Sequence, residues 1–262
     1  AVRAVTDNSI PTNGGCFRPV SLHLPEGTLV NPVEPAPVNS RTATLKRIAG
    51  SIVGALKGAL PDHIPADSAG ELLVLSLGGK SLAGKPYVVG EFNAGGSGGG
   101  PRKDGVDVIE TDGSNCMNMP VEALELEAPV RVHRMSLRTD SGGVGEFRGG
   151  LGCVREIEFL SDDIALTHRG ERHRHAARGS QGGGAGAKAL SKIVRRDGSE
   201  EMVNSKLFTV VHAGERLIVE TAGGGGYGKP NKRNRQAIRD DVSNRKVSQQ
   251  CANAEYGLDD VN

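Results

Sequence analysis

Short apolar runs separated by glycine are the main pattern along most of the chain. Runs of this length that end at glycine are typical of β-strands, whereas a helix needs a longer stretch with apolar residues three or four positions apart. Near the N-terminus, Val20, Leu22 and Leu24 alternate with polar residues, which predicts a half-buried strand. Further strands are predicted over residues 71–77, 87–92, 129–137, 154–160, 164–167, 208–211 and 216–220.

One long segment has a helical pattern instead. Between residues 40 and 60, apolar side chains recur at spacings of three and four: Leu45, Ile48, Ile52 and Leu56. Ser40 is placed to cap this helix and Pro61 to end it. Small residues occupy much of the remaining surface, so we expect the helix to pack closely on two sides.

These patterns predict a mixed α/β (α+β) fold, predominantly antiparallel β-sheet with glycine-rich turns in its C-terminal half, with one long packed helix near residues 40–60. Residues 1–128 are interpreted as a mixed α/β part and residues 129–228 as a β-rich, glycine-turn region of the same domain. Residues 229–262 are expected to form a charged helical tail. Two short helices are expected in the tail, the second behind a cap at Ser248.

The glycine content is unusually high and unevenly distributed. The chain has 38 glycines in 262 residues, and more than half of them lie in clusters at residues 95–100, 142–145, 149–152, 182–186 and 223–228. Glycine supplies positive φ and lets another backbone or a ligand approach closely. We therefore expect tight turns and bare backbone surfaces that build a site from loops. In residues 140–143 we expect a turn with at least one glycine at positive φ.

Charge and cysteine content exclude several classes of partner. Lys and Arg number 32 against 31 Asp and Glu, for a net charge of +1, which gives no field for nucleic acid or an anionic membrane surface. No apolar run approaches the ~20 residues of a membrane span. The four cysteines are far apart and include no CxxC pair. We expect reduced thiols in a cytoplasmic protein with no nucleic-acid or membrane partner.

The densest polar stretch runs from residue 168 to residue 175. His173 and His175 alternate, so on an extended segment they would share a face and could hold a divalent metal. Arginines crowd the same stretch, which favours an anion such as a substrate carboxylate over a second cation. A solvated edge with no ligand remains the third alternative.

An acidic run at residues 104–112 follows the first glycine cluster, with Asn115 and Glu122 after it. Carboxylate and amide groups in a loop can bind a hard cation or act as a general base, but they are also common turn formers. Gly96 and Gly98 suggest a phosphate-binding loop. The residues that follow, 101–105, predict a turn and not a helix, so the phosphate-binding geometry is not expected here.

Several long segments resemble a known family in the family's own order. They include NGGCFRP at residues 13–19, NCMNMPVE at 115–122, DSGGVGEFRGGLG at 140–152 and HRGER at 168–172, and they continue through residues 221–228 to the tail. On these segments the chain resembles the hydantoinase B/5-oxoprolinase family over nearly its whole length. A full-length B-type subunit is about twice as long, and this sequence is similar to its C-terminal half.

The resemblance implies a component of an ATP-dependent enzyme that opens a cyclic amide such as a hydantoin or 5-oxoproline. Related carboxylases act on acetone and acetophenone. The implied partner is an A-type subunit with an actin-like ATPase fold, which would bind ATP with magnesium. Whether a further divalent metal is present stays open. A component of a carboxylase, and a truncated piece that only keeps an interaction surface, are the alternative interpretations.

Within the matched segments, residue types suggest roles for a ring-opening reaction. Asp107 or Glu122 would serve as the base, and backbone N–H groups of Gly142 and Gly143 would stabilise the developing negative charge. The expected substrate-binding residues are Arg18, Asn115, Arg169, Gly142 and Gly143.

Overall fold

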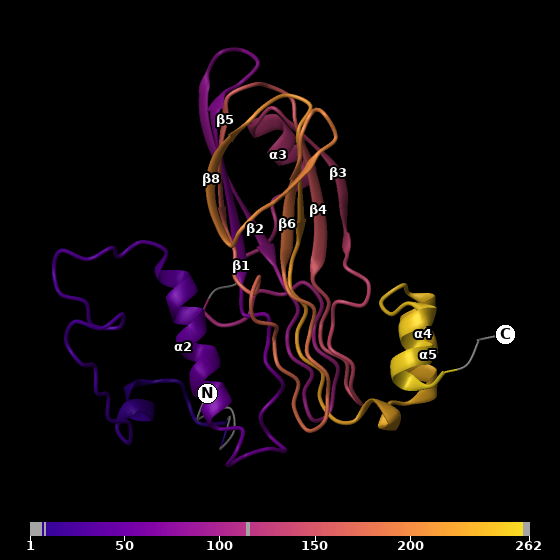
Figure 1. Cartoon of the computed structure of the whole chain (residues 1–262). Helices are drawn as coiled ribbons and strands as arrows, with labels where there is room; N and C mark the ends of the chain where they lie inside the picture. The colour runs from indigo at the N-terminus through magenta and orange to yellow at the C-terminus, as the bar shows by residue number, and fades with distance from the viewer. Residues whose placement is uncertain (1–6, 8, 114–115, 259–262) are drawn as a thin grey trace.

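The computed structural model describes residue 7 and residues 9–113 and 116–258. Two antiparallel sheets form a β-sandwich, and extended glycine-rich segments continue from one end of it (Figure 1). One helix lies on one side of these segments and a helical pair lies on the other. The mixed α/β fold with antiparallel sheets is therefore confirmed.

The strands follow the predicted runs closely, since local alternation determines which residues can lie between two sheets. The first sheet has the order β2-β1-β5-β8, with β1 at Leu72–Lys80, β2 at Pro86–Ala94, β5 at Ile164–Arg169 and β8 at Lys206–Val211. The second has the order β3-β4-β9-β6-β7, with β3 at Val130–Leu137, β4 at Cys153–Phe159, β9 at Arg216–Glu220, β6 at Leu190–Val194 and β7 at Glu200–Met202. The sequence did not predict β6, β7 or the helix α3 at Val121–Glu127.

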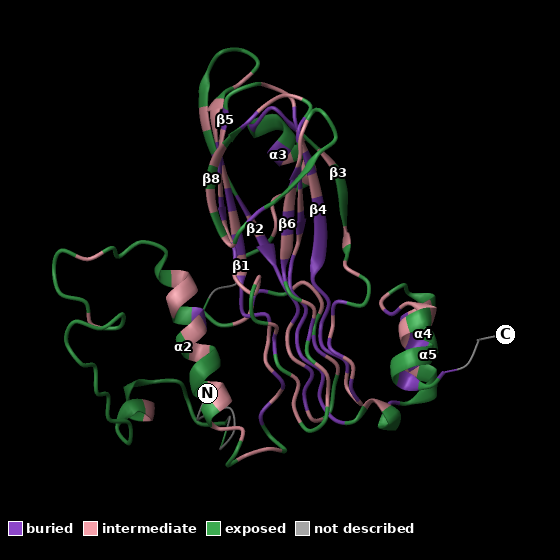
Figure 2. Ribbon diagram, viewed as in Figure 1, coloured by how far each residue is buried: buried purple, intermediate pink, exposed green. Residues whose placement is uncertain are grey.

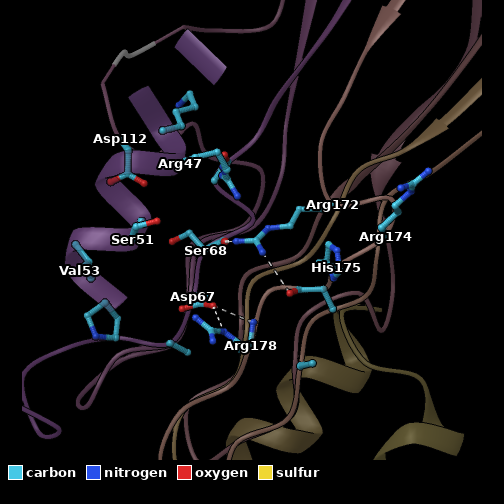
Figure 3. Close-up of a pocket in the computed structure, with 17 residues that line it drawn as sticks. Arg47, Ser51, Val53, Asp67, Ser68, Asp112, Arg172, Arg174, His175 and Arg178 are labelled. Carbon is cyan, nitrogen blue, oxygen red and sulfur yellow. Dashed lines mark hydrogen bonds and ion pairs between the residues drawn. The ribbon is translucent and has the colours of Figure 1, made fainter. Parts of the chain in front are cut away.

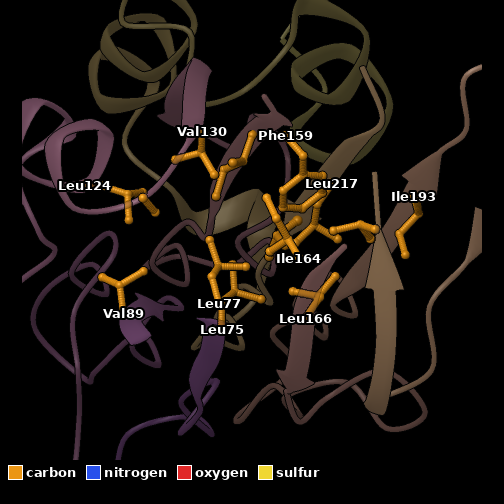
Figure 4. Close-up of a cluster of buried hydrophobic side chains, with 14 of the residues drawn as sticks. Leu75, Leu77, Val89, Leu124, Val130, Phe159, Ile164, Leu166, Ile193 and Leu217 are labelled. Atoms are coloured by element: carbon orange, nitrogen blue, oxygen red, sulfur yellow. The ribbon is translucent and has the colours of Figure 1, made fainter. Parts of the chain in front are cut away.

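Apolar side chains from both sheets fill the sandwich (Figure 4). Leu75 and Leu77 of β1 join Ile157 of β4 and Leu217 of β9 in one buried cluster. Toward the glycine-rich end the same inward-facing positions become polar: Glu91, Asn93, Arg155, His168 and Ser191 are all buried. The interior therefore changes from an apolar core to a polar belt along the strands.

The glycine-rich segments form a layer of backbones joined by hydrogen bonds, called here the glycine layer. Gly150 N–H donates to Ser97 O at 2.8 Å, Gly224 N–H to Gly150 O at 2.9 Å, and Gly143 N–H to Gly224 O at 2.8 Å. A Cβ on Gly224 would lie 1.9 Å from Ser97 O, and one on Gly150 would lie 2.0 Å from Val106 O. These positions require glycine because neighbouring backbones approach too closely for any side chain.

The turn at residues 140–143 differs from the prediction. Its positive φ, 59°, belongs to Asp140, and neither Gly142 nor Gly143 is in the left-handed region. A Cβ on Gly142 would lie 2.0 Å from Gly149 O. Close packing, and not a tight turn, is therefore the reason for these glycines.

The predicted long helix is α2, Arg41–Ala55. Ser40 does precede it, but with φ 57° and no side-chain hydrogen bond to a helix N–H, so the predicted cap is wrong. The described part of the chain covers the apolar face of the helix only in part, since Leu45, Ile48 and Ile52 are 40–48% exposed. Figure 2 shows the helix largely as exposed and intermediate ribbon.

The strand predicted at residues 20–24 is also wrong. Residues 9–40 are loop apart from the short 3-10 helix η1 at Gly14–Phe17, and Val20, Leu22 and Leu24 are exposed. An alternating segment becomes a strand only where another strand pairs with it. No strand of the described chain lies beside this one.

The tail contains the expected pair of helices, α4 at Arg235–Ser243 and α5 at Gln249–Tyr256, after a 3-10 turn η2 at Pro230–Lys232. Ser248 caps α5 as predicted, since its Oγ accepts from Cys251 N at 3.1 Å. The division at residue 128 falls between α3 and β3, and the first sheet draws strands from both sides of it. In the part of the chain that the structure describes, no helix has the length and apolarity needed to cross a membrane.

Candidate functional site

A cleft of ≈ 690 Å³ lies between α2 and two segments of the chain, residues 65–70 and 172–178 (Figure 3). Its lining is mostly polar and carries more positive than negative side chains. The charged and titratable residues of the lining are Lys46, Arg47, Asp67, Asp112, Arg172, Arg174, His175 and Arg178.

Arg172 builds the wall of the cleft. Its guanidinium donates to Ala69 O and Ser68 O, both at 2.8 Å, and to Ala176 O at 3.2 Å. Its own φ is 60°, a conformation that these bonds help to hold. Because its donors are used on backbone carbonyls, Arg172 holds the segment at residues 172–178 against the segment at residues 65–70, and the two together face α2.

Asp67 is one of the two carboxylates that line the cleft. Its Oδ2 lies 3.0 Å from Arg178 Nε, and its Oδ1 accepts from Lys57. Burial of the carboxylate raises its pKa, but the hydrogen bonds and charges of Lys57 and Arg178 outweigh this and keep the pKa below its usual value. Asp67 therefore stays ionised and holds Arg178 at the cleft.

The exposed carboxylate of Asp112 also lines the cleft, and among the cationic and imidazole groups of the lining Arg174 and His175 are free to bind a ligand. Both are exposed, and within the described chain neither side chain has a hydrogen-bond or ion-pair partner. A guanidinium offers paired donors that match a carboxylate or phosphate. Arg174 also lines a second cavity of ≈ 670 Å³.

The two histidines that were predicted to share a face lie differently. His173 Nδ1 is 2.8 Å from Glu171 O, and its ring meets that of His168 edge-on, with centroids 5.4 Å apart. His175 lines the cleft. Among the residues that the structure describes, no three His, Cys, Asp or Glu side chains come together as a metal site would require. The anion and solvated-edge interpretations of this stretch stay predictions.

Arg169 acts on the cleft through the helix. Its Nη1 donates to Ser40 Oγ at 2.8 Å, directly before α2. The bond links the end of β5 to the start of the helix that forms one side of the cleft. The Ser40 hydroxyl therefore accepts a hydrogen bond from Arg169 and does not cap the helix.

Asp107 and Glu122 are not brought together. Asp107 sits against the glycine layer, where its Oδ2 lies 2.8 Å from Lys246 Nζ and its Oδ1 accepts from Leu151 N at 2.9 Å. Burial raises the pKa of Asp107, but these partners and Arg148 outweigh it and lower the pKa, which weakens the group as a base. Glu122 is exposed in the first turn of α3, at the opposite end of the sandwich (Figure 1).

The other predicted binding residues are dispersed. Arg18 is exposed in the N-terminal loop, and Asn115 falls outside the described residues. Gly143 N–H already donates to Gly224 O at 2.8 Å, so its use as an oxyanion donor would require breaking a bond of the glycine layer. Gly142 packs its backbone against Gly149.

Sequence reasoning missed Arg47 and Asp67, which no motif singles out and which reach the cleft only through folding. It also missed Glu71, which directly precedes the first strand. Glu71 is buried and accepts from Ala222 N at 2.8 Å and Glu171 N at 3.1 Å. Burial raises the pKa of this carboxyl to about 7. Glu71 does not line the cleft, and its hydrogen bonds join the backbone at Glu171 to the backbone at Ala222.

Comparison with known proteins gives one consistent result. The sequence signature of the family described as hydantoinase B/oxoprolinase matches residues 1–230. The chain is 36% identical to the beta subunit of the caprolactamase of Pseudomonas jessenii, over 95% of this chain and 45% of that protein. It is 32% identical to the B-type subunit of a putative D-/L-hydantoinase of Pseudomonas sp. (strain NS671), over 95% and 42%. With the 5-oxoprolinase of Dictyostelium discoideum it shares 33% identity, over 87% and 17%.

Solved structures agree with the sequence comparison. The crystal structure of the ATP-dependent caprolactamase from Pseudomonas jessenii matches with a TM-score of 0.85 and 31% identity, over 100% of this chain and 47% of that one. A nucleotide-free acetone carboxylase matches with a TM-score of 0.74 and 19% identity, over 90% and 37%, which shows a shared fold alone. The chain thus spans less than half the length of these relatives.

Proposed function

This chain belongs to the hydantoinase B/oxoprolinase family, and from that premise we propose that it is the C-terminal part of the B-type component of an ATP-dependent cyclic amide hydrolase. The ring opened is of the hydantoin or 5-oxoproline type. The partner is an A-type ATPase subunit, which binds ATP with magnesium. The names of the relatives support this assignment, since they include the corresponding components of a hydantoinase and of a caprolactamase.

In this function the cleft beside α2 binds the negatively charged part of the substrate or of the activated intermediate. A cyclic amide is a poor electrophile, and transfer of a phosphoryl group from ATP to the amide oxygen would create a leaving group before water attacks. Substrate carboxylate and phosphorylated intermediate are both anions that a guanidinium recognises. The observation that carries the proposal is the exposed, unpartnered Arg174 in a cleft of the described chain with a positive wall.

Other residues enter the proposal in different ways. Arg169 is a positioning residue, because it holds the start of the helix that carries Arg47 and Ser51 into the cleft. Direct substrate contacts by Arg18 and Asn115 stay predictions. Asp107 and Glu122 stay predictions as the base.

The experiment is a steady-state assay of ring opening and ADP release. The complete enzyme, assembled with its partner, is offered 5-oxoproline, hydantoin and caprolactam with ATP and magnesium. For 5-oxoproline, which carries a carboxylate, Arg174→Ala should raise KM by roughly 10- to 100-fold, the effect of losing a hydrogen bond to a charged group, whereas KM for the uncharged hydantoin and caprolactam should change little. Arg131→Ala is the matched control, since Arg131 is exposed on β3 and has no partner within the described residues.

The outcomes separate the alternatives. Equal KM values for the Arg174→Ala and Arg131→Ala enzymes would show that Arg174 and the cleft do not bind the substrate. Bicarbonate-dependent consumption of a ketone, with no ring opening, would make the assembly a carboxylase. Full activity without this chain would make it a non-catalytic interaction piece.

A further inference from the structure

The second cavity, of ≈ 670 Å³, lies at the end of the β-sandwich that meets the glycine layer. It is bounded by the start of β6, the end of β7, the start of β8 and the residue that follows β3. The buried residues of its lining are Ala189, Ser191 and Val203. A volume of this size is typical of small-molecule sites, which measure roughly 300–1,000 Å³.

The charged side chains that line this cavity are all basic. They are Arg138, Arg174, Lys188 and Lys206, and none of the described residues of the lining is Asp or Glu. His173 also lines the cavity, and burial lowers the pKa of its ring, which favours the neutral form. A space whose walls carry charge of one sign attracts counter-ions. The lining therefore favours an anion.

Two of these cations are held in place by carboxylates that lie outside the lining. Arg138 Nε is 2.8 Å from Glu220 Oε2, and Arg138 Nη1 donates to Lys188 O at 2.6 Å. Lys206 Nζ is 2.9 Å from Glu171 Oε1. A guanidinium carries five N–H groups and an ammonium three, so Arg138 and Lys206 keep donors for a ligand while their positions are fixed.

The other two cations, Arg174 and Lys188, are not neutralised. Both are exposed, and neither side chain has a hydrogen-bond or ion-pair partner within the described chain. The cavity thus presents two positive charges in excess of the neighbouring carboxylates. A phosphate group carries a charge of about −1.5 to −2 at neutral pH and several acceptor oxygens, so it matches both the charge and the donors. A monoanion would leave one cation without a partner.

We propose that this cavity is a binding site for a phosphate dianion, either free or carried by a small organic molecule. The proposal does not rest on ring opening, because Arg138, Lys188 and Lys206 do not line the cleft beside α2. Leu190 and Met202 also line the cavity, and they offer an apolar surface to the organic part of a phosphate ester. Free phosphate would use the basic side chains alone.

The test measures binding to the full chain by isothermal titration calorimetry in a buffer without phosphate. Inorganic phosphate and phenyl phosphate are the dianions, and acetate is the monoanion. We expect one phosphate to bind per chain, at least tenfold more tightly than acetate. Lys188→Ala should weaken phosphate binding at least tenfold, Lys188→Arg should retain it, and Lys188→Ala combined with Arg174→Ala should abolish it.

The matched control is Lys85→Ala combined with Arg131→Ala. It removes the same two kinds of charge from exposed positions elsewhere, where neither side chain has a partner within the described residues. The control variant should bind phosphate like the parent chain. Far-ultraviolet circular dichroism of each variant shows whether the β-sandwich is folded.

Three results would overturn the proposal. They are absence of phosphate binding to the parent chain, acetate binding as tight as phosphate binding, and equal weakening in the control and in the variant that lacks Lys188 and Arg174. The last result would show that only the net charge of the chain matters. Where the proposal holds, tighter binding of phenyl phosphate than of inorganic phosphate identifies a phosphate ester as the ligand, and the reverse order identifies free phosphate.

Discussion

Arg155 and Glu91 form an ion pair that joins the two sheets: Arg155 Nη1 in β4 lies 2.6 Å from Glu91 Oε1 in β2, with both side chains almost wholly buried. Burial raises the pKa of Glu91, and the charge of Arg155 opposes that shift. Arg155 Nη2 and Nε and Glu91 Oε2 have no hydrogen-bond partner within the described chain. The pair is therefore incompletely satisfied, and each charge depends on the other.

The first prediction follows from this dependence. Arg155→Met should lower the free energy of unfolding by about 3–5 kcal/mol, since it leaves the Glu91 carboxylate buried without its cation. Urea denaturation at pH 7 measures the change. In the double variant, with Glu91→Met added, much of the loss should be recovered because no buried charge remains. If the loss of unfolding free energy in the double variant equals the sum of the losses in the two single variants, the explanation is contradicted.

The second prediction concerns the glycine layer. Gly150→Ala and Gly224→Ala should each cost about 3 kcal/mol or more, because the added Cβ meets a backbone carbonyl within about 2 Å and no side chain can move aside. Thermal unfolding gives the comparison. Gly50→Ala is the control: this helical glycine has nothing within 4 Å of an added Cβ, so alanine should stabilise slightly. Equal melting temperatures for all three variants would show that the layer tolerates side chains.

The third prediction uses the buried carboxyl of Glu71. Its pKa in the folded chain is raised to about 7, above the usual value near 4.5, so the folded state holds the proton more tightly than the unfolded state. The contribution of Glu71 to stability is therefore fully present below pH 4.5 and is lost as pH rises to 7. The size is on the order of 3 kcal/mol. Glu71→Gln should remove this loss in urea titrations at a series of pH values. An unchanged slope would show that Glu71 titrates normally.

The fourth prediction has the opposite sign. Burial, and next the neighbouring His173, lower the pKa of His168 to about 4 from 6.5. The neutral ring is then favoured in the folded chain, so its contribution to stability is present above pH 6.5 and is lost as pH falls toward 4. His168→Gln can keep a hydrogen bond to Ser191 but cannot titrate, and it should flatten the decline at acid pH. In the parent chain, the effects of Glu71 and His168 on the free energy of unfolding have opposite signs between pH 4.5 and 6.5. Each single variant should therefore show the pH dependence that the other group causes. If both variants keep the parent's profile, neither group is responsible for it.

The sequence by itself determined most of the β-strands, the long helix and the family. Strands such as β1, β4 and β9 were predictable because they are short apolar runs, a pattern that is local in the sequence and typical of strands. The helical cap at Ser248 was predictable because capping is local. The motifs of the family were readable without any structure, since they are runs of neighbouring residues.

Tertiary structure decided the rest. The sequence located the glycine clusters, but only the contact of backbones from segments such as 97–98 and 223–224 shows that most of these glycines are needed for close packing and not for a turn. The cleft depends in the same way on Arg47, Asp67 and Arg174, which are brought together from distant parts of the chain. The alternating residues 20–24 formed no strand because pairing requires a partner that the described chain does not place there. The local sequence pattern determines which secondary structure a segment can form, but its contacts with other backbones and charges depend on the tertiary structure.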